Sequence, residues 1–160
     1  MTIRPHNLRI RLAQAIDDAF ILGLVGRFVE FELPAWRKRN ECAEGIRRDV
    51  ARHLSDLPPG SHMFVAEDED GALTGFVHLQ TATDFFTGAQ NCHIGDLAVA
   101  PGFDGRGIGS ALLAFAEDWA RRHGCRHVTL AVFPGNERAR ALYERHGYGT
   151  ELLRMTKRIG

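Results

Sequence analysis

Four glycines within eight residues, at positions 102, 105, 107 and 109, separate an aliphatic segment from an amphipathic one. The aliphatic segment, residues 91–100, is rich in β-branched side chains and ends at Pro101, which has no N–H to donate to a sheet. The segment after the loop has helical spacing of its apolar side chains, which are Ile108, Ala111, Leu112, Phe115 and Trp119. The pattern therefore predicts a strand, a glycine loop and a helix. Free N–H groups at such a helix start, beside a loop with few side chains, favour phosphate oxygens.

The aliphatic segment changes phase in its middle. Leu97 and Val99 share one face by the period of two, whereas Ile94 falls on the opposite parity. Gly95 and Asp96 lie between them, so we expect a β-bulge near Gly95 that brings the two halves into register.

Two motifs resemble the GCN5-related N-acetyltransferase (GNAT) superfamily. The window Asp104-Gly105-Arg106-Gly107-Ile108-Gly109 resembles its acetyl-CoA signature, although Asp104 stands where the family usually has Arg or Gln. The run from Asn136 to Tyr143, followed by Gly147-Tyr148, resembles a second sequence pattern of the superfamily and lies at the expected distance after the glycine loop. The resemblance in element order covers nearly the full chain.

The expected architecture is a single α/β domain over residues 1–160 with a mixed sheet and the order βααβββαβαβ. We expect strands near 8–12, 63–67, 74–83, 91–100 and 127–132. Helices are expected near 15–31, 41–54, 137–146 and from the glycine loop to Gly124. The family normally ends in two strands, but no turn signal follows Gly149, so we expect one long strand over 148–160. Its edge is available to a partner chain, which favours a homodimer.

Composition excludes several classes of protein. Twenty basic and twenty acidic residues give a formal net charge of zero, which argues against a nucleic-acid partner. No apolar run approaches the length of a membrane span, and no zinc-ligand spacing occurs, so we expect no membrane association and no metal. Three cysteines, an odd number without close spacing, favour a reduced, cytoplasmic setting.

The resemblance implies a binding site for acetyl-CoA as cosubstrate. It assigns the phosphate cradle to Asp104, Gly105, Arg106, Gly107, Ile108, Gly109 and Ser110, and backbone contacts with pantetheine to Leu97, Ala98 and Val99. Arg106 is equally well explained as a solvated loop arginine. Asn136 is an expected N-cap of the last helix, and the resemblance makes it a pantetheine contact as well.

Three side chains are candidates for catalysis of direct transfer to an amine. The resemblance makes Tyr143 the acid that hydrogen-bonds the departing thiolate, whereas its alternative role is a core-facing aromatic. His93 is the first candidate for the base that deprotonates the amine, and Asp96, at the expected bulge, is the second. A histidine packed on the sheet and a carboxylate that stabilises the bulge are the structural alternatives.

The acceptor is expected to be a small primary amine. Glu30, Trp36, Phe85 and Phe86 are candidate contacts, because they combine carboxylates with aromatic rings in connecting segments, although a hydrophobic hinge or core packing would also account for them. The run from Ala114 to Ala120 looks similar to the central helix of aminoglycoside 6′-N-acetyltransferases. A protein or peptide acceptor, and a non-catalytic acyl-CoA sensor on the same fold, are the alternatives.

Overall fold

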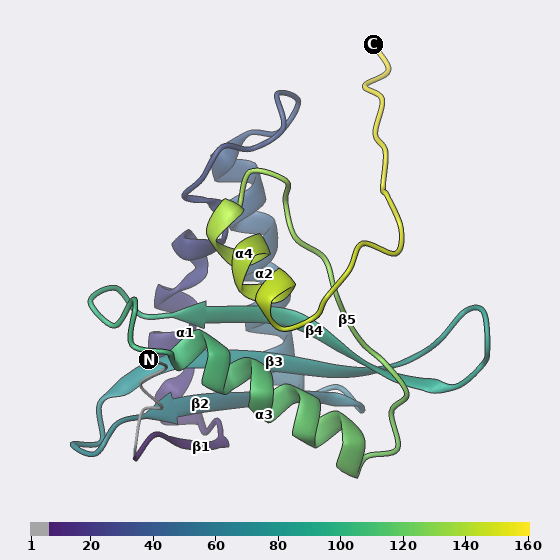
Figure 1. Ribbon diagram of the computed structural model, residues 1–160. Helices are drawn as coiled ribbons and strands as arrows, with labels where there is room; N and C mark the ends of the chain where they lie inside the picture. The colour runs from purple at the N-terminus through teal and green to yellow at the C-terminus, as the bar shows by residue number, and fades with distance from the viewer. Residues whose placement is uncertain (1–6) are drawn as a thin grey trace.

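The computed structural model describes residues 7–160, which form one five-stranded mixed sheet with helices on both faces (Figure 1). The strands are β1 (Arg9–Leu12), β2 (Ser61–Glu67), β3 (Leu73–Thr83), β4 (Gln90–Val99) and β5 (Val128–Leu130), in that spatial order. The first four run antiparallel to their neighbours, and β5 runs parallel to β4. The predicted mixed α/β fold is confirmed.

The helices follow the predicted order, with one difference near the N-terminus. They are η1 (Ala15–Asp17), α1 (Asp18–Gly23), η2 (Val25–Val29), α2 (Arg39–Asp56), α3 (Ile108–Arg122) and α4 (Glu137–Arg145), where η denotes a 3₁₀-helix. The helix expected over 15–31 is divided into three short pieces. Helix α1 ends at Gly23 and Gly26 lies within η2, and glycine costs about 1 kcal/mol relative to alanine inside an α-helix. The apolar spacing, through Ile16, Ala19, Phe20, Leu24 and Phe28, predicted neither the continuity nor the buried face, because Ile16 is 84% exposed and the buried side chains include Ile21, Val25 and Val29.

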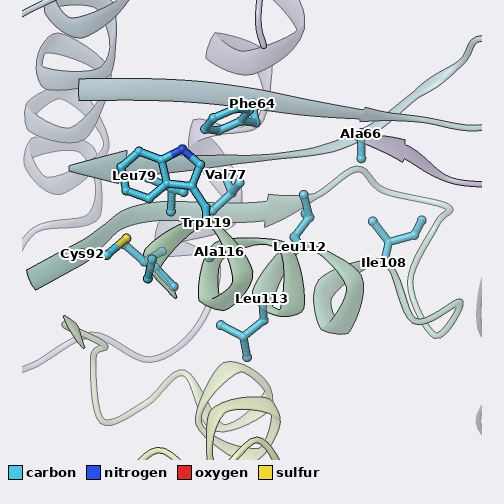
Figure 2. Packing of buried hydrophobic residues seen from close by; sticks show 12 residues of the cluster. Phe64, Ala66, Val77, Leu79, Cys92, Ile108, Leu112, Leu113, Ala116 and Trp119 are labelled. Carbon is cyan, nitrogen blue, oxygen red and sulfur yellow. The ribbon is translucent and has the colours of Figure 1, made fainter. Parts of the chain in front are cut away.

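Helix α3 covers one face of the sheet (Figures 1 and 2). Its fully buried Leu112, Leu113 and Ala116 pack on side chains from the central strands, among them Val77 and Leu79. The amphipathic stripe thus becomes the centre of the larger hydrophobic core. The glycine loop is held at the end of this core because α3 begins directly after it.

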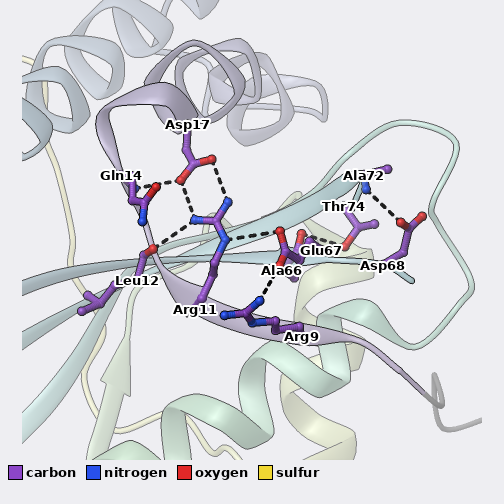
Figure 3. A network of polar contacts seen from close by, with 10 residues as sticks. All are labelled: Arg9, Arg11, Leu12, Gln14, Asp17, Ala66, Glu67, Asp68, Ala72 and Thr74. Carbon is purple, nitrogen blue, oxygen red and sulfur yellow. Dashed lines mark hydrogen bonds and ion pairs between the residues drawn. The ribbon is translucent and has the colours of Figure 1, made fainter. Parts of the chain in front are cut away.

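Helices α1 and α2 cover the opposite face, where Ile21 and Val50 are fully buried against Val65 and Phe76. A polar network fastens β1 and η1 to this layer (Figure 3). The Arg11 guanidinium lies 2.8 and 3.1 Å from the two carboxylate oxygens of Asp17, and its Nε lies 3.3 Å from Glu67. The paired guanidinium lowers the pKa of Asp17, so that this buried carboxyl is ionised.

The predicted bulge in β4 is present. His78 pairs with Asp96 and Leu79 pairs with Ile94, so Gly95 is the extra residue in the ladder. A Cβ at Gly95 would lie 3.1 Å from both Gln80 Oε1 and His78 Nδ1, so the site favours glycine. The bulge places Asp96 on the face of the sheet that α2 covers, opposite His78.

The predicted C-terminal strand is wrong for this structure. After α4 the chain continues to Gly160 without regular structure and leads away from the sheet (Figure 1). Leu152, Leu153, Met155 and Ile159 are 72–89% exposed. A β-strand requires a ladder partner, and the segment makes no pairing with the short β5 within residues 7–160. The lack of a turn signal after Gly149 was therefore not sufficient to place this segment in the sheet.

Candidate active site

A cleft of about 470 Å³ opens where β4 and β5 separate. The two parallel strands are paired from Cys92–Val128 to Ile94–Leu130, and the cleft begins beyond that point. Residues 95–99 line one wall and residues 130–133 line the other. On the cleft side, residues 95–99 pair with no strand among residues 7–160. An extended ligand with amide groups can therefore hydrogen-bond to this open edge of β4.

The glycine loop and the start of α3 form one end of the cleft. Gly105 and Gly107 both have φ of 76°, a conformation that glycine adopts without strain, and Gly107 is the N-cap of α3. In residues 7–160 no side chain caps this helix start, which leaves its first N–H groups directed toward the cleft end. Gly109 lies close to α4, since a Cβ there would approach Leu142 to 3.2 Å.

Two arginines from distant segments converge on Asp104. Its Oδ1 atom lies 2.6 Å from the Arg27 guanidinium and 3.3 Å from that of Arg138. Arg27 also pairs with Glu30 at 3.0 Å and donates from Nε to the Val99 carbonyl at 3.1 Å. Asp104, at the position where Arg or Gln is usual, thus gathers two positive charges beside the glycine loop. Arg27 gave no signal in the sequence because it lies 77 positions before Asp104, in a segment whose pattern only predicts a helix.

Arg106 is placed differently from the rest of the predicted cradle. Its guanidinium lies 5.1 Å from the centroid of the Phe103 ring, a cation–π geometry, and it does not line the cleft. Its neighbours in the motif do line it; they are Asp104, Gly105, Gly107, Ile108, Gly109 and Ser110.

Helix α4 brings Asn136 and Tyr143 to the cleft. The Asn136 side chain accepts a hydrogen bond from the Ala139 N–H at 3.2 Å, so the predicted N-cap is confirmed. Tyr143 is half-buried, and burial raises the pKa of its phenol. The hydroxyl therefore keeps its proton at neutral pH and can donate it to an anion in the cleft.

The two candidate bases occupy different environments. Asp96 lines the cleft, its side chain is 10% exposed, and its Oδ2 lies 2.9 Å from His78 Nδ1. His93 is not among the residues that line the cleft in the described part of the chain, and its Nδ1 lies 2.9 Å from Thr129 Oγ1. Burial lowers the pKa of His93, which favours its neutral ring. Of the two candidate bases, Asp96 therefore lines the cleft and His93 does not.

The four candidate acceptor contacts are not brought together. Glu30 lines the cleft beside Phe28 and Phe31. Trp36, 49% exposed, lies instead at a separate small hollow next to the C-terminal segment. Phe85 and Phe86 lie between β3 and β4, are 93% and 67% exposed, and contact each other edge to face outside the cleft lining.

The structure gives little support to a cysteine nucleophile, a metal site or a membrane-spanning helix. Burial raises the pKa of the Cys92 thiol to about 12, so this cysteine is a poor nucleophile. Within residues 7–160, no group of three or more histidine, cysteine or acidic side chains is arranged to hold a metal ion. The helices of the same residues are too short or too polar to cross a bilayer.

Comparison with known proteins identifies the family. The model of the acetyltransferase (GNAT) family matches residues 27–148, which include the cleft, the glycine loop and α4. The chain belongs to the GNAT family. A GNAT relative named as the uncharacterized N-acetyltransferase YhfO of Bacillus subtilis is 30% identical over 141 residues, with 88% of this chain and 89% of that protein covered.

A second relative and a solved structure are similar to different shares of the chain. Streptothricin acetyltransferase of Streptomyces lavendulae is 40% identical over 88 residues, which are 55% of this chain and 44% of that protein. The solved structure of a putative acetyl transferase from Pyrococcus furiosus has a TM-score of 0.74 and 28% identity, with 96% of this chain and all of that one covered. This GNAT chain is therefore an acetyl-transferring enzyme.

GNAT enzymes generally use acetyl-CoA as acyl donor, and the residues of the cleft fit that molecule. An uncapped helix start and two arginines suit its phosphates. The open edge of β4 suits its pantetheine amides. Asp104, at the position where Arg or Gln is usual, holds Arg27 and Arg138 beside this GNAT loop.

Proposed function

We propose that the chain transfers the acetyl group of acetyl-CoA to the primary amine of a small molecule, within a ternary complex in the cleft between β4 and β5. The observation that carries the proposal is the position of Asp96 and Tyr143. They line the same cleft from β4 and from α4, and the glycine loop closes one of its ends. A base, a proton donor and a phosphate cradle thereby share one cavity, as a direct transfer requires.

The chain binds the donor along β4. Backbone N–H groups at the start of α3, together with the Arg27 and Arg138 guanidiniums, hold the diphosphate. The backbone of Leu97, Ala98 and Val99 extends the sheet by pairing with pantetheine, and its N–H groups stabilise the oxyanion that forms at the carbonyl. The bound donor supplies a thioester to these groups.

The chain also moves two protons. Asp96 accepts one from the substrate ammonium, which frees the nitrogen lone pair for attack on the carbonyl carbon. Tyr143 donates its hydroxyl proton to the sulfur as the C–S bond breaks and regains a proton from the acetylated nitrogen. We prefer Asp96 to His93 as base because its carboxylate lines the cleft, whereas the His93 ring is paired with Thr129.

The acceptor is a cationic small amine in this proposal. The Asp96 and Glu30 carboxylates in the cleft favour a positively charged substrate, and the relative named for streptothricin acetylation is consistent with that class. A panel of streptothricin, aminoglycosides, polyamines, amino acids and peptides, assayed for release of the coenzyme thiol, tests it. Turnover of peptides alone would refute the small-molecule acceptor. Tight binding of acetyl-CoA without turnover of any amine would favour the non-catalytic sensor.

Two further properties belong to the proposal. The exposed apolar side chains of residues 152–159 support a homodimer in which the C-terminal segment contacts a second copy, and a monomer in light scattering would refute it. The three cysteines are free, which is consistent with a cytoplasmic, reducing location.

A further inference from the structure

A chain of buried polar side chains lies between the sheet and α2, behind the cleft. His78 Nδ1 lies 2.9 Å from Asp96 Oδ2, and His78 Nε2 lies 2.8 Å from Ser61 Oγ. Ser61 Oγ in turn lies 2.8 Å from Nδ1 of His53 on α2. His78 is fully buried and His53 is 5% exposed. Polar rings at such depth are costly unless every nitrogen has a partner, and here each nitrogen has one.

The outer end of this chain fixes the direction of its hydrogen bonds. His53 Nε2 lies 3.3 Å from a guanidinium nitrogen of Arg52 and 3.4 Å from the amide nitrogen of Gln80. Both of these groups are donors, so Nε2 accepts and the ring proton of His53 is on Nδ1. The nearest oxygen of Asp49 is 3.6 Å from Nε2, beyond hydrogen-bond distance. Burial lowers the pKa of His53, which agrees with a neutral ring.

The remaining protons follow one after another. His53 Nδ1–H donates to the Ser61 hydroxyl oxygen, and the single hydroxyl proton is then left for His78 Nε2. With Nε2 as acceptor, the neutral His78 ring carries its proton on Nδ1, where it donates to Asp96. Every donor in the chain therefore points toward the cleft.

We propose that His78, Ser61 and His53 are positioning residues for acetyl transfer, which hold Asp96 as a carboxylate and leave its Oδ1 atom free for the substrate amine. The inference rests on the proposed function, in which Asp96 is the base. A hydrogen bond donated to an ionised carboxylate favours the ionised form, and occupation of Oδ2 fixes the rotation of the carboxylate.

The protein begins and ends the transfer step in the same protonation state. The substrate ammonium gives one proton to Asp96 Oδ1, its lone pair forms the C–N bond, and the C–S bond breaks with its electron pair on sulfur. Tyr143 gives its hydroxyl proton to that sulfur, and the second proton that the nitrogen loses restores the Tyr143 hydroxyl. Asp96 then returns the proton to solvent through the open cleft. His78, Ser61 and His53 keep their protons throughout. The other titratable or charged groups that face Asp96 or share its cleft are His93, His53, Arg27, Glu30, Asp104, Arg138, Tyr143 and Arg145.

Measurement of the histidine tautomers in the full chain, without any ligand, tests the direction of these hydrogen bonds. Nitrogen-15 NMR of histidine-labelled protein near neutral pH distinguishes Nδ1–H, Nε2–H and doubly protonated rings, and His53→Gln and His78→Asn assign the signals. The proposal predicts neutral Nδ1–H tautomers for both His53 and His78. An Nε2–H or a doubly protonated ring at His78 overturns it.

Two substitutions of His78 separate positioning from mere packing. The amide nitrogen of His78→Asn occupies the place of Nδ1 and can still donate to Asp96, whereas that of His78→Gln occupies the place of Nε2. The kcat for thiol release should therefore fall about tenfold in His78→Gln and by less in His78→Asn, while the KM for acetyl-CoA is unchanged. Ser61→Ala should lower kcat in the same direction. His62→Gln, which removes a histidine packed on Trp119 on the other face of β2, is the matched control and should leave kcat unchanged.

The outcomes distinguish this inference from the function on which it rests. A wild-type kcat in both His78→Gln and Ser61→Ala overturns the positioning role and leaves the base assignment intact. Retention of wild-type thiol release by Asp96→Asn, measured with the amine that the protein acetylates fastest, overturns the base assignment itself.

Discussion

The two tyrosines of the chain lie five residues apart, and Tyr143 lines the cleft whereas Tyr148 does not. The Tyr148 ring packs against the Tyr143 ring, with their centroids 5.9 Å apart. Replacement of Tyr143 by Phe removes the hydroxyl and keeps the ring. A hydrogen bond to a charged partner contributes about 1.5–3 kcal/mol, so loss of the donor to the thiolate should lower the rate of transfer by about 10- to 150-fold. Because the bond forms only as sulfur acquires charge, KM for acetyl-CoA should change little.

Tyr148→Phe is the matched control for this experiment. The Tyr148 hydroxyl is buried and has no hydrogen-bond partner within residues 7–160, and its ring lies outside the cleft lining. Its removal should leave the transfer rate unchanged and should not lower the melting temperature, since an unpaired buried hydroxyl carries a desolvation cost.

The assay is a single-turnover measurement of thiol release with enzyme in excess, so that slow product release does not hide the chemical step. Circular dichroism melting of both variants shows whether the fold is intact. Equal transfer rates for Tyr143→Phe and wild type, or an equal loss in Tyr148→Phe, would refute the assignment of Tyr143 as proton donor.

Three further predictions concern stability and coenzyme binding. Because Arg11 depresses the pKa of Asp17, the stabilisation from this pair is present above the ordinary carboxyl pKa and is lost as the pH falls through the depressed value. Acid unfolding should show that loss in wild type and not in Asp17→Asn. At neutral pH, urea titration should find Asp17→Asn about 3 kcal/mol less stable than wild type. Gly135→Ala should lower stability by about 1–3 kcal/mol or more, since its Cβ would lie 2.0 Å from a backbone oxygen, whereas Gly23→Ala, with no atom within 4 Å, should not; equal melting temperatures would contradict the packing there. Gly107→Val, at φ of 76° on the helix start, should weaken acetyl-CoA binding about tenfold or more in calorimetry, and unchanged affinity would exclude this loop as the phosphate cradle.

Local patterns predicted those parts of the fold that depend on neighbours in sequence. The bulge at Gly95 followed from a change of parity within one strand, and the N-cap at Asn136 followed from the residue type before a helical pattern. The α3 stripe likewise identified its buried face. In each case the determining interactions lie within a few residues.

Features that depend on distant segments were not predictable in this way. The end of the first α-helix at Gly23 reflects the low helix propensity of glycine, which the apolar spacing did not reveal. The expected final strand failed because pairing requires a free edge at the right place, which a single sequence does not reveal. The convergence of Arg27 on Asp104, and of His78 on Asp96, joins residues 77 and 18 positions apart.

The central claim is that acetyl moves directly from the coenzyme to an amine in the β4–β5 cleft. Acid-quenched single turnover with radiolabelled acetyl-CoA, followed over time by mass spectrometry of the intact protein, tests it most directly. The claim predicts that label passes to the amine without an acetylated form of the protein at any time, and that Asp96→Asn slows this transfer. Label that accumulates first on Cys92 or Cys125 and then moves to the amine would contradict it.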